Sequence, residues 1–192
     1  MYSVLKNYIN SRIQISETDL NLISEYFLPI KVKKKQFLLR EGEICKHLWF
    51  VSKGCLRMFK EDRKGHEHIL LFAFEEYWVG DRESVVSDKP SDYHVEAIED
   101  SELLQISKEK LNDLYQQIPS FREMHIALQQ RSFNKLQERM QKTLSFSAEE
   151  KYADIMNHQP EILHRVPLSM VASYLGISRE TLSRIRANQL KR

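Results

Sequence analysis

The most constraining feature of this sequence is the regular spacing of glycine through its first half. Gly42, Gly54 and Gly65 are separated by 12 and 11 residues, and Gly80 follows 15 residues later. Each interval holds a short apolar or aromatic run bounded by polar residues. Glycine suits corners between strands because it enters positive φ without a steric penalty from Cβ. The spacing therefore predicts hairpins of a small antiparallel barrel or sandwich.

The expected strands are the runs around these glycines and two later segments. They cover residues 37–39, 48–51, 55–59, 69–74, 93–98 and 102–106. In 93–98 polar and apolar residues alternate, which is typical of a strand with one buried face.

The residue types change after Ser107, where Gln, Lys, Glu, Leu and Met replace the β-branched residues. Pro119 can open a helix, because a residue in the first turn has no intrahelical partner for its N–H. The apolar stripe along a helix of about 25 residues consists of Phe121, Met124, Leu128, Leu136, Met140 and Leu144. We predict that this stripe is a dimer seam, since no second helix of similar length is expected to cover it. Packing on the chain's own barrel is the alternative.

A capping signal marks the next helix. Ser147 stands three residues before Glu150, which is the spacing of a capping box. We expect this helix to run from about residue 148 to residue 158 and to stop near Pro160.

The sharpest pattern lies between Pro167 and Arg186. Pro167 can open a short helix, Gly176 can end it, and Ser178 can cap a second helix. The expected inward residues of the two helices are Val171, Ala172, Leu175, Leu182 and Ile185. A small residue at the crossing and a glycine at the turn are typical of a helix-turn-helix, whose second helix enters the major groove of DNA.

The outward face of the second helix carries chemistry that fits bases. Arg179, Glu180 and Arg184 lie at about 0°, 100° and 140° around the helix, away from the inward residues. Arginine pairs with the O6 and N7 atoms of guanine, and glutamate accepts from the amino group of cytosine. The stretch from His164 to Arg192 has six basic residues and one acidic residue, whereas the whole chain has a net charge of +2. An ordinary solvated pair of helices is the alternative.

The run Ser178-Arg179-Glu180-Thr181-Leu182-Ser183-Arg184 closely resembles the recognition helix of the Crp/Fnr transcription regulators. In that family the residues equivalent to Arg179, Glu180 and Arg184 contact bases. Residues 39–43 and 48–54 are similar to early hairpins of the family's cyclic-nucleotide-binding domain. The resemblance implies a homodimer on a palindromic site in double-stranded DNA, with RNA polymerase as a further partner.

We therefore predict an α+β fold in three regions. Residues 1–117 form a cyclic-nucleotide-binding-like, jelly-roll-like β-roll, 118–144 form the dimerisation helix, and 145–192 form a winged-helix-like helix-turn-helix. The predicted DNA-binding residues are Ser178, Arg179, Glu180, Thr181, Ser183, Arg184 and Arg186. The wing is expected to be truncated, with Arg186, Lys191 and Arg192 contacting phosphates in its place.

The resemblance also indicates an effector pocket formed by Gly80, Asp81, Arg82, Ser91 and Asp92. Members that bind cyclic AMP have a Gly-Glu pair at the ribose and an Arg-Ser pair at the phosphate. Gly80-Asp81 matches the first pair with a shorter acid, and Ser91-Asp92 stands in place of the second. Because an Asp repels a phosphate, we expect that cyclic AMP is not bound in the usual way. No cofactor is assigned, and a cyclic nucleotide is the one candidate.

Other classes of function lack their motifs. The chain has two cysteines, Cys45 and Cys55, whereas an iron–sulfur cluster needs four ligands. His66 and His68 fit a solvated turn, and no metal site is predicted. No P-loop, nucleophile elbow or His-Glu-x-x-His motif is present, so we predict no enzyme.

The absence of a signal segment and of a long apolar run favours a cytoplasmic protein that does not enter a membrane. The alternative function is a cyclic-nucleotide-type regulatory module whose helical tail docks a protein partner. The charged face of Arg179, Glu180 and Arg184 argues against it, since a docking tail would expose apolar residues there.

Overall fold

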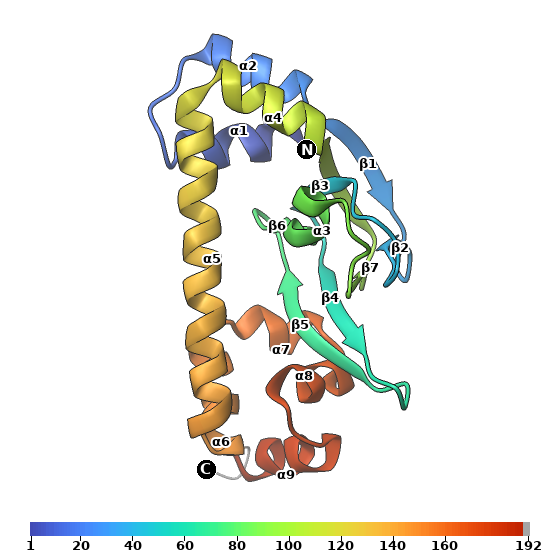
Figure 1. Cartoon of the computed structure of the whole chain (residues 1–192). Helices are drawn as coiled ribbons and strands as arrows, with labels where there is room; N and C mark the ends of the chain where they lie inside the picture. Colours follow the sequence, from blue (N-terminus) through green and yellow to red (C-terminus); the bar gives the residue numbers. More distant parts are fainter. Residues whose placement is uncertain (190–192) are drawn as a thin grey trace. The chain divides into compact units, whose positions relative to one another are not determined.

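The computed structural model describes residues 1–189 and has the predicted α+β class (Figure 1). Its strands are β1 (Leu28–Val32), β2 (Phe37–Leu39), β3 (His47–Lys53), β4 (Leu56–Glu61), β5 (Glu67–Ala73), β6 (Trp78–Val79), β7 (His94–Ala97) and β8 (Ser101–Ser107). Its helices are α1 (Tyr2–Asn10), α2 (Glu17–Glu25), α3 (Arg82–Ser87), α4 (Lys108–Gln117), α5 (Pro119–Ser145), α6 (Ala148–His158), α7 (Pro160–Arg165), α8 (Leu168–Leu175) and α9 (Arg179–Gln189).

The strands form two four-stranded sheets, in the orders β1-β8-β3-β6 and β2-β7-β4-β5. This is the predicted β-roll, but the expectation of a hairpin at each glycine is wrong. Only Gly65 lies between consecutive strands that are neighbours in one sheet, β4 and β5. At Gly42, Gly54 and Gly80 the chain passes from one sheet to the other. The spacing of apolar runs locates strand ends but does not say which strand is the neighbour.

Strand β7 is not half-buried as its alternation predicted, because Val95, Glu96 and Ala97 are all buried. Glu96 is accommodated by Arg57 on β4, whose Nε and Nη2 atoms both lie 2.6 Å from the carboxylate Oε2. The Arg57 guanidinium also stacks 4.0 Å from the centre of the Phe59 ring. A buried carboxylate is tolerated when a cation pairs with it, and this partner lies 39 residues away in the sequence.

The N-terminal helices α1 and α2 were not predicted. Their buried residues include Leu5, Ile9 and Ile23, and the Tyr8 ring meets Phe50 of β3 edge to face at a centroid distance of 5.1 Å. These contacts make the helices part of the core around the sheet that contains β3.

The contacts divide the chain into two compact units. The first contains Met1–Lys60 and Phe72–Gln129, and the second contains Glu61–Leu71 together with the chain from Gln130 onward. The division falls inside α5, a helix of 27 residues that begins at Pro119 as predicted. The limits proposed for the three functional regions remain a prediction.

The assignment of Phe121 and Met124 to the dimer seam is wrong, because both side chains are buried inside the first unit. The Phe121 ring lies among aromatic neighbours, 6.2 Å from Tyr115 and 6.5 Å from Trp78 between ring centroids. Leu128 is half-buried. The large apolar side chains that α5 exposes are Ile126, Phe133, Leu136, Met140 and Leu144.

Candidate nucleic-acid interface and sensor site

Helices α8 and α9 form the predicted helix-turn-helix within the second unit. Gly176 follows α8 in the left-handed conformation at φ 65°, which glycine adopts without strain. The five predicted inward residues are all buried: Val171, Ala172, Leu175, Leu182 and Ile185. Helix α6 beside them begins with the predicted capping box of Ser147 and Glu150.

Ser178 caps α9 as the sequence predicted. Its Oγ accepts a hydrogen bond of 3.1 Å from the Thr181 N–H, and its hydroxyl donates to Thr181 Oγ1 at 3.1 Å. The remaining predicted contact residues divide by exposure: Arg179, Glu180, Ser183 and Arg184 are exposed, whereas Thr181 and Arg186 are half-buried. Lys191 and Arg192 lie outside the described residues.

The exposed face of α9 holds charges that are not neutralised by ion pairs. Within residues 1–189, neither Arg179 nor Arg184 has a carboxylate partner within 4 Å. A hydrogen bond from its own backbone N–H holds the pKa of Glu180 below its usual value, so this carboxylate is ionised at neutral pH. The face therefore presents two guanidinium groups that can donate hydrogen bonds and one carboxylate that can accept them.

The position of α8 depends on an arginine whose role was not apparent from the sequence. The Arg139 guanidinium donates to the carbonyls of Ile69 and Leu70 in the 61–71 segment and to the carbonyl of Tyr174 at the end of α8. It also stacks 3.9 Å from the centre of the Tyr174 ring. Burial lowers the pKa of Arg139, but three carbonyl acceptors compensate for its lost hydration.

Ser173 on α8 adds a second link to the same segment. Its Oγ accepts from the Ile69 N–H at 3.1 Å, and its hydroxyl donates to the Glu67 carbonyl at 2.5 Å. The side chain thus satisfies backbone groups that lie more than 100 residues away in the sequence.

In the first unit, the structure brings together three of the residues assigned to the effector pocket. Gly80 has φ 148°, and a Cβ there would lie 2.7 Å from the Leu48 side chain. The Asp81 carboxylate caps α3 through the N–H groups of Glu83 and Ser84, and it accepts a 2.7 Å hydrogen bond from the Ser91 hydroxyl. Asp81 and Ser91 are both buried. The Asp81 carboxylate, which stands where the family's ribose-binding acid lies, is therefore hydrogen-bonded to other groups of the chain.

The other two assigned residues lie elsewhere. Asp92 is exposed, and its carboxylate pairs with Lys60 Nζ at 3.2 Å. Arg82 is exposed and lines a separate cavity with residues of α4 and α5. Neither side chain adds a positive charge to Asp81 and Ser91.

Comparisons with known proteins agree with this architecture. Residues 29–118 match the cyclic nucleotide-binding domain. The transcriptional activator protein Anr of Pseudomonas protegens is 27% identical over 168 residues, which cover 80% of this chain and 67% of that protein. Anr of Pseudomonas aeruginosa is 26% identical over 165 residues, with the same coverage. The chain is thus similar to transcription regulators of the Crp/Fnr type.

Solved structures of other proteins show the same fold. The c-di-GMP responsive global regulator CLP of Xanthomonas campestris matches with a TM-score of 0.75 at 16% identity, over 92% of each chain. FixK2 of Bradyrhizobium japonicum matches with a TM-score of 0.72 at 19% identity, over 86% of this chain and 85% of that one. At these identities the similarity shows a shared fold.

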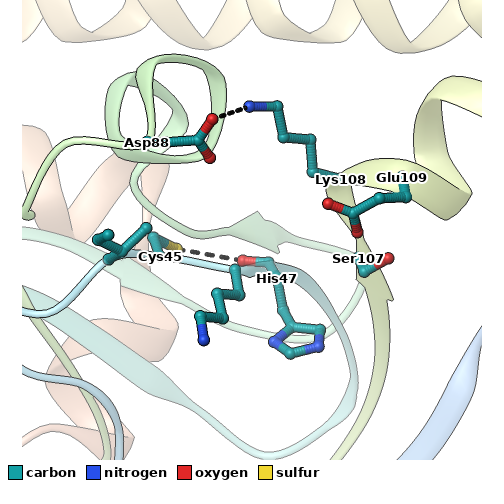
Figure 2. Close-up of a pocket in the computed structure, with 8 residues that line it drawn as sticks. Cys45, His47, Asp88, Ser107, Lys108 and Glu109 are labelled. Carbon is teal, nitrogen blue, oxygen red and sulfur yellow. Dashed lines mark hydrogen bonds and ion pairs between the residues drawn. The ribbon is translucent and has the colours of Figure 1, made fainter.

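A cavity of about 310 Å³ is lined by residues that include Cys45 and His47 (Figure 2). The Cys45 thiol donates a hydrogen bond to the backbone carbonyl of His47, with 3.2 Å between Sγ and the oxygen. Burial raises the pKa of the Cys45 thiol and lowers that of His47, so both are neutral at pH 7. Lys108 at the rim pairs with Asp88 at 2.7 Å. The arrangement is not that of an activated thiol.

His66 and His68 both approach one oxygen of Asp62 in the 61–71 segment, at 3.3 and 3.1 Å. Among residues 1–189 no group of three His, Cys, Asp or Glu side chains is placed to hold a metal ion. No helix in that same range is long and apolar enough to cross a bilayer.

Proposed function

We propose that this chain is a Crp/Fnr transcription regulator that binds a palindromic DNA site as a homodimer, with α9 as its recognition helix. The observation that carries the proposal is the exposed face of α9, where Arg179, Glu180 and Arg184 lie opposite the buried Leu182 and Ile185.

The chemistry of this face suits direct reading of bases. Arg179 and Arg184, which have no carboxylate partner among residues 1–189, match the two acceptors of guanine, and Glu180 matches the amino group of cytosine. Ser178, Thr181, Ser183 and Arg186 are assigned to phosphates, which position the helix without reading sequence. A face so charged is poorly suited to docking an apolar protein surface, which disfavours the alternative of a protein-binding tail.

The homodimer is supported by the exposed apolar residues of α5. Ile126, Phe133 and Met140 recur at intervals of seven residues, with Leu136 and Leu144 beside them. A seven-residue repeat on a long helix is the pattern of a coiled-coil seam. This set replaces the seam that included Phe121 and Met124.

The sensor residues support binding that does not need cyclic AMP. Asp81 is engaged by α3 and Ser91, Arg82 lines a separate cavity, and Asp92 is an acid that pairs with Lys60. An anionic cyclic phosphate placed here would lose its hydration without gaining a positive partner. The proposed partners are double-stranded DNA and RNA polymerase, and the proposed location is the cytoplasm.

The experiment is a selection of duplexes from random DNA by the purified protein, with and without cyclic AMP. We expect the same palindrome in both arms. Enrichment only with cyclic AMP would contradict the assignment at Asp81 and Ser91. Enrichment of a single half-site would contradict the homodimer, and no enrichment in either arm would contradict sequence-specific binding.

A further inference from the structure

A second cavity of about 310 Å³ lies within the first unit, between helices α3, α4 and α5. On each helix the first lining residue is a cation: Arg82 on α3, Lys108 on α4 and Arg122 on α5. The other lining residues of each helix follow that cation by three, four or seven positions. Each helix thus turns one face toward the cavity and places a cation at the first position of that face. The volume is at the lower end of the range of about 300–1,000 Å³ for small-molecule sites.

The charge of this cavity is entirely positive. No aspartate or glutamate lines it. Lys108 is neutralised by Asp88, whose Oδ2 lies 2.7 Å from Nζ. Arg82 and Arg122 have no carboxylate partner in the described part of the chain. Two guanidinium groups from different helices therefore remain available at one opening.

The remaining lining is mostly apolar. Leu48, Val85 and Leu111 are buried residues on the cavity wall, and the exposed side chains of Val86 and Ile126 extend the apolar surface outward. A purely inorganic anion would leave this surface unused. The combination matches a molecule with an anionic end and a compact apolar body.

The groups behind the cavity add no charge of their own. The Tyr115 hydroxyl is hydrogen-bonded to His125 Nδ1. Burial raises the pKa of Tyr115 to about 12 and lowers that of His125 to about 4, so both are neutral at pH 7. The Trp78 ring covers His125 at a centroid distance of 4.8 Å. The positive potential at the opening therefore comes from Arg82 and Arg122.

We propose that this cavity binds a small organic anion, a carboxylate or phosphate on an apolar body, held by Arg82 and Arg122. The site is separate from the cyclic-nucleotide position, because Gly80, Asp81 and Ser91 do not line it. Its role as an effector site rests on the proposed function. Ile126 lines the cavity and is also a seam residue of α5, so the ligand and a second copy of the chain would meet at one side chain.

The first test is isothermal titration calorimetry of the full-length protein without DNA. The probes are 4-phenylbutyrate, octanoate and phenyl phosphate, with the neutral 4-phenylbutyramide as the isosteric control. We expect saturable binding of at least one anion at one site per chain, and binding of the amide at least about tenfold weaker. The carboxylate and phosphate arms distinguish the two head groups. Saturation by none of the anions, or equal binding of the amide, would overturn the proposal.

Variants locate the site. Arg82→Gln and Arg122→Gln should each weaken the anion by about tenfold or more, since each removes one charge-assisted contact. Arg131→Gln is the matched control, because Arg131 is exposed on α5 and does not line the cavity. Val86→Trp keeps both arginines and should block the cavity, since Val86 is an exposed lining residue. Unchanged binding in the two Gln variants, or an equal loss in Arg131→Gln, would place the anion elsewhere.

The binding test and the DNA test fail independently. An anion that binds a protein unable to select any duplex would leave the cavity assigned and the DNA-binding proposal refuted. A protein that selects a palindrome but binds none of the probes would keep its proposed function and lose this site.

Discussion

At the scale of single residues, Arg179 and Arg184 on the exposed face of α9 carry the proposed recognition. Arg184→Ala should weaken binding to the selected palindrome by about 1–3 kcal/mol, because one bidentate contact to a base is lost. Its exposed side chain contributes nothing to the helix-turn-helix core, so the fold and the dimer should persist. The measurement is a fluorescence-anisotropy titration at fixed salt, with Arg131→Ala as the control for lost charge. Equal affinities of Arg184→Ala and Arg131→Ala would remove Arg184 from the readout.

His125 makes the stability of the first unit depend on pH. Its pKa is about 4 in the folded protein and has an ordinary value of 6.5, because burial disfavours the charged imidazole. As pH falls from about 6.5 to about 4, the unfolded chain takes up a proton that the folded chain does not. The free energy of unfolding should therefore fall by about 3 kcal/mol across this window from His125 alone.

Urea titrations at several pH values measure this effect. His125→Phe should flatten the dependence between pH 6.5 and 4, whereas His164→Phe should leave it unchanged, since His164 is exposed. Parallel curves for the native protein and His125→Phe would show that the imidazole titrates normally.

At the scale of secondary-structure elements, helix α5 is expected to hold the dimer through Phe133 and Met140. Replacing both with Glu should give a monomer in sedimentation velocity, because like charges would face each other in a seven-residue seam. Asn134→Glu with Gln141→Glu is the matched control, as both residues are exposed and have the same spacing. A dimer in the first variant, or a monomer in the control, would move the seam to another surface.

Arg139 is expected to stabilise the second unit by joining α5, α8 and the 61–71 segment. Arg139→Met keeps much of the side-chain length but leaves the carbonyls of Ile69, Leu70 and Tyr174 without this donor. We expect a loss of about 1–3 kcal/mol in the free energy of unfolding measured with urea. Arg131→Met, on an exposed part of the same helix, should lose almost nothing. Equal stabilities would mean that water replaces the guanidinium without cost.

The sequence predicts those elements whose signals are local. Ser147, Gly176 and Ser178 mark helix ends within a few residues, and the three-to-four residue periodicity identifies the buried side of α8 and α9. It fails where a residue depends on a distant partner. The sequence pattern predicts that Glu96 is exposed, because its partner Arg57 lies on another strand. The partners of Arg139 lie up to 70 residues away.

At the scale of the whole molecule, the sequence predicts the fold class and the helix-turn-helix pair better than the side chains around the sensor site. Arg179, Glu180 and Arg184 lie on one exposed face of one helix, so helical periodicity alone places them together. The cavity of Arg82 and Arg122 was missed because it is assembled from three helices that are distant in sequence, of which α3 and α4 were not predicted individually. Phe121 and Met124 were wrongly assigned to the dimer seam for a related reason. Helical periodicity identifies an apolar stripe but does not say whether the same chain or a second copy covers it.

The second unit has a further consequence for the order in which the chain is made. Glu67 leaves the ribosome 106 residues before Ser173, the side chain that binds its carbonyl. The backbone groups of Glu67 and Ile69 therefore lack this partner until Ser173 has been translated. Contacts between residues so distant in sequence slow folding, because closing a long loop costs conformational entropy before the stabilising contacts form. Synthesis halted before residue 139 would leave this segment without its guanidinium, so the second unit completes these contacts only after Ser173 and Tyr174 have been made.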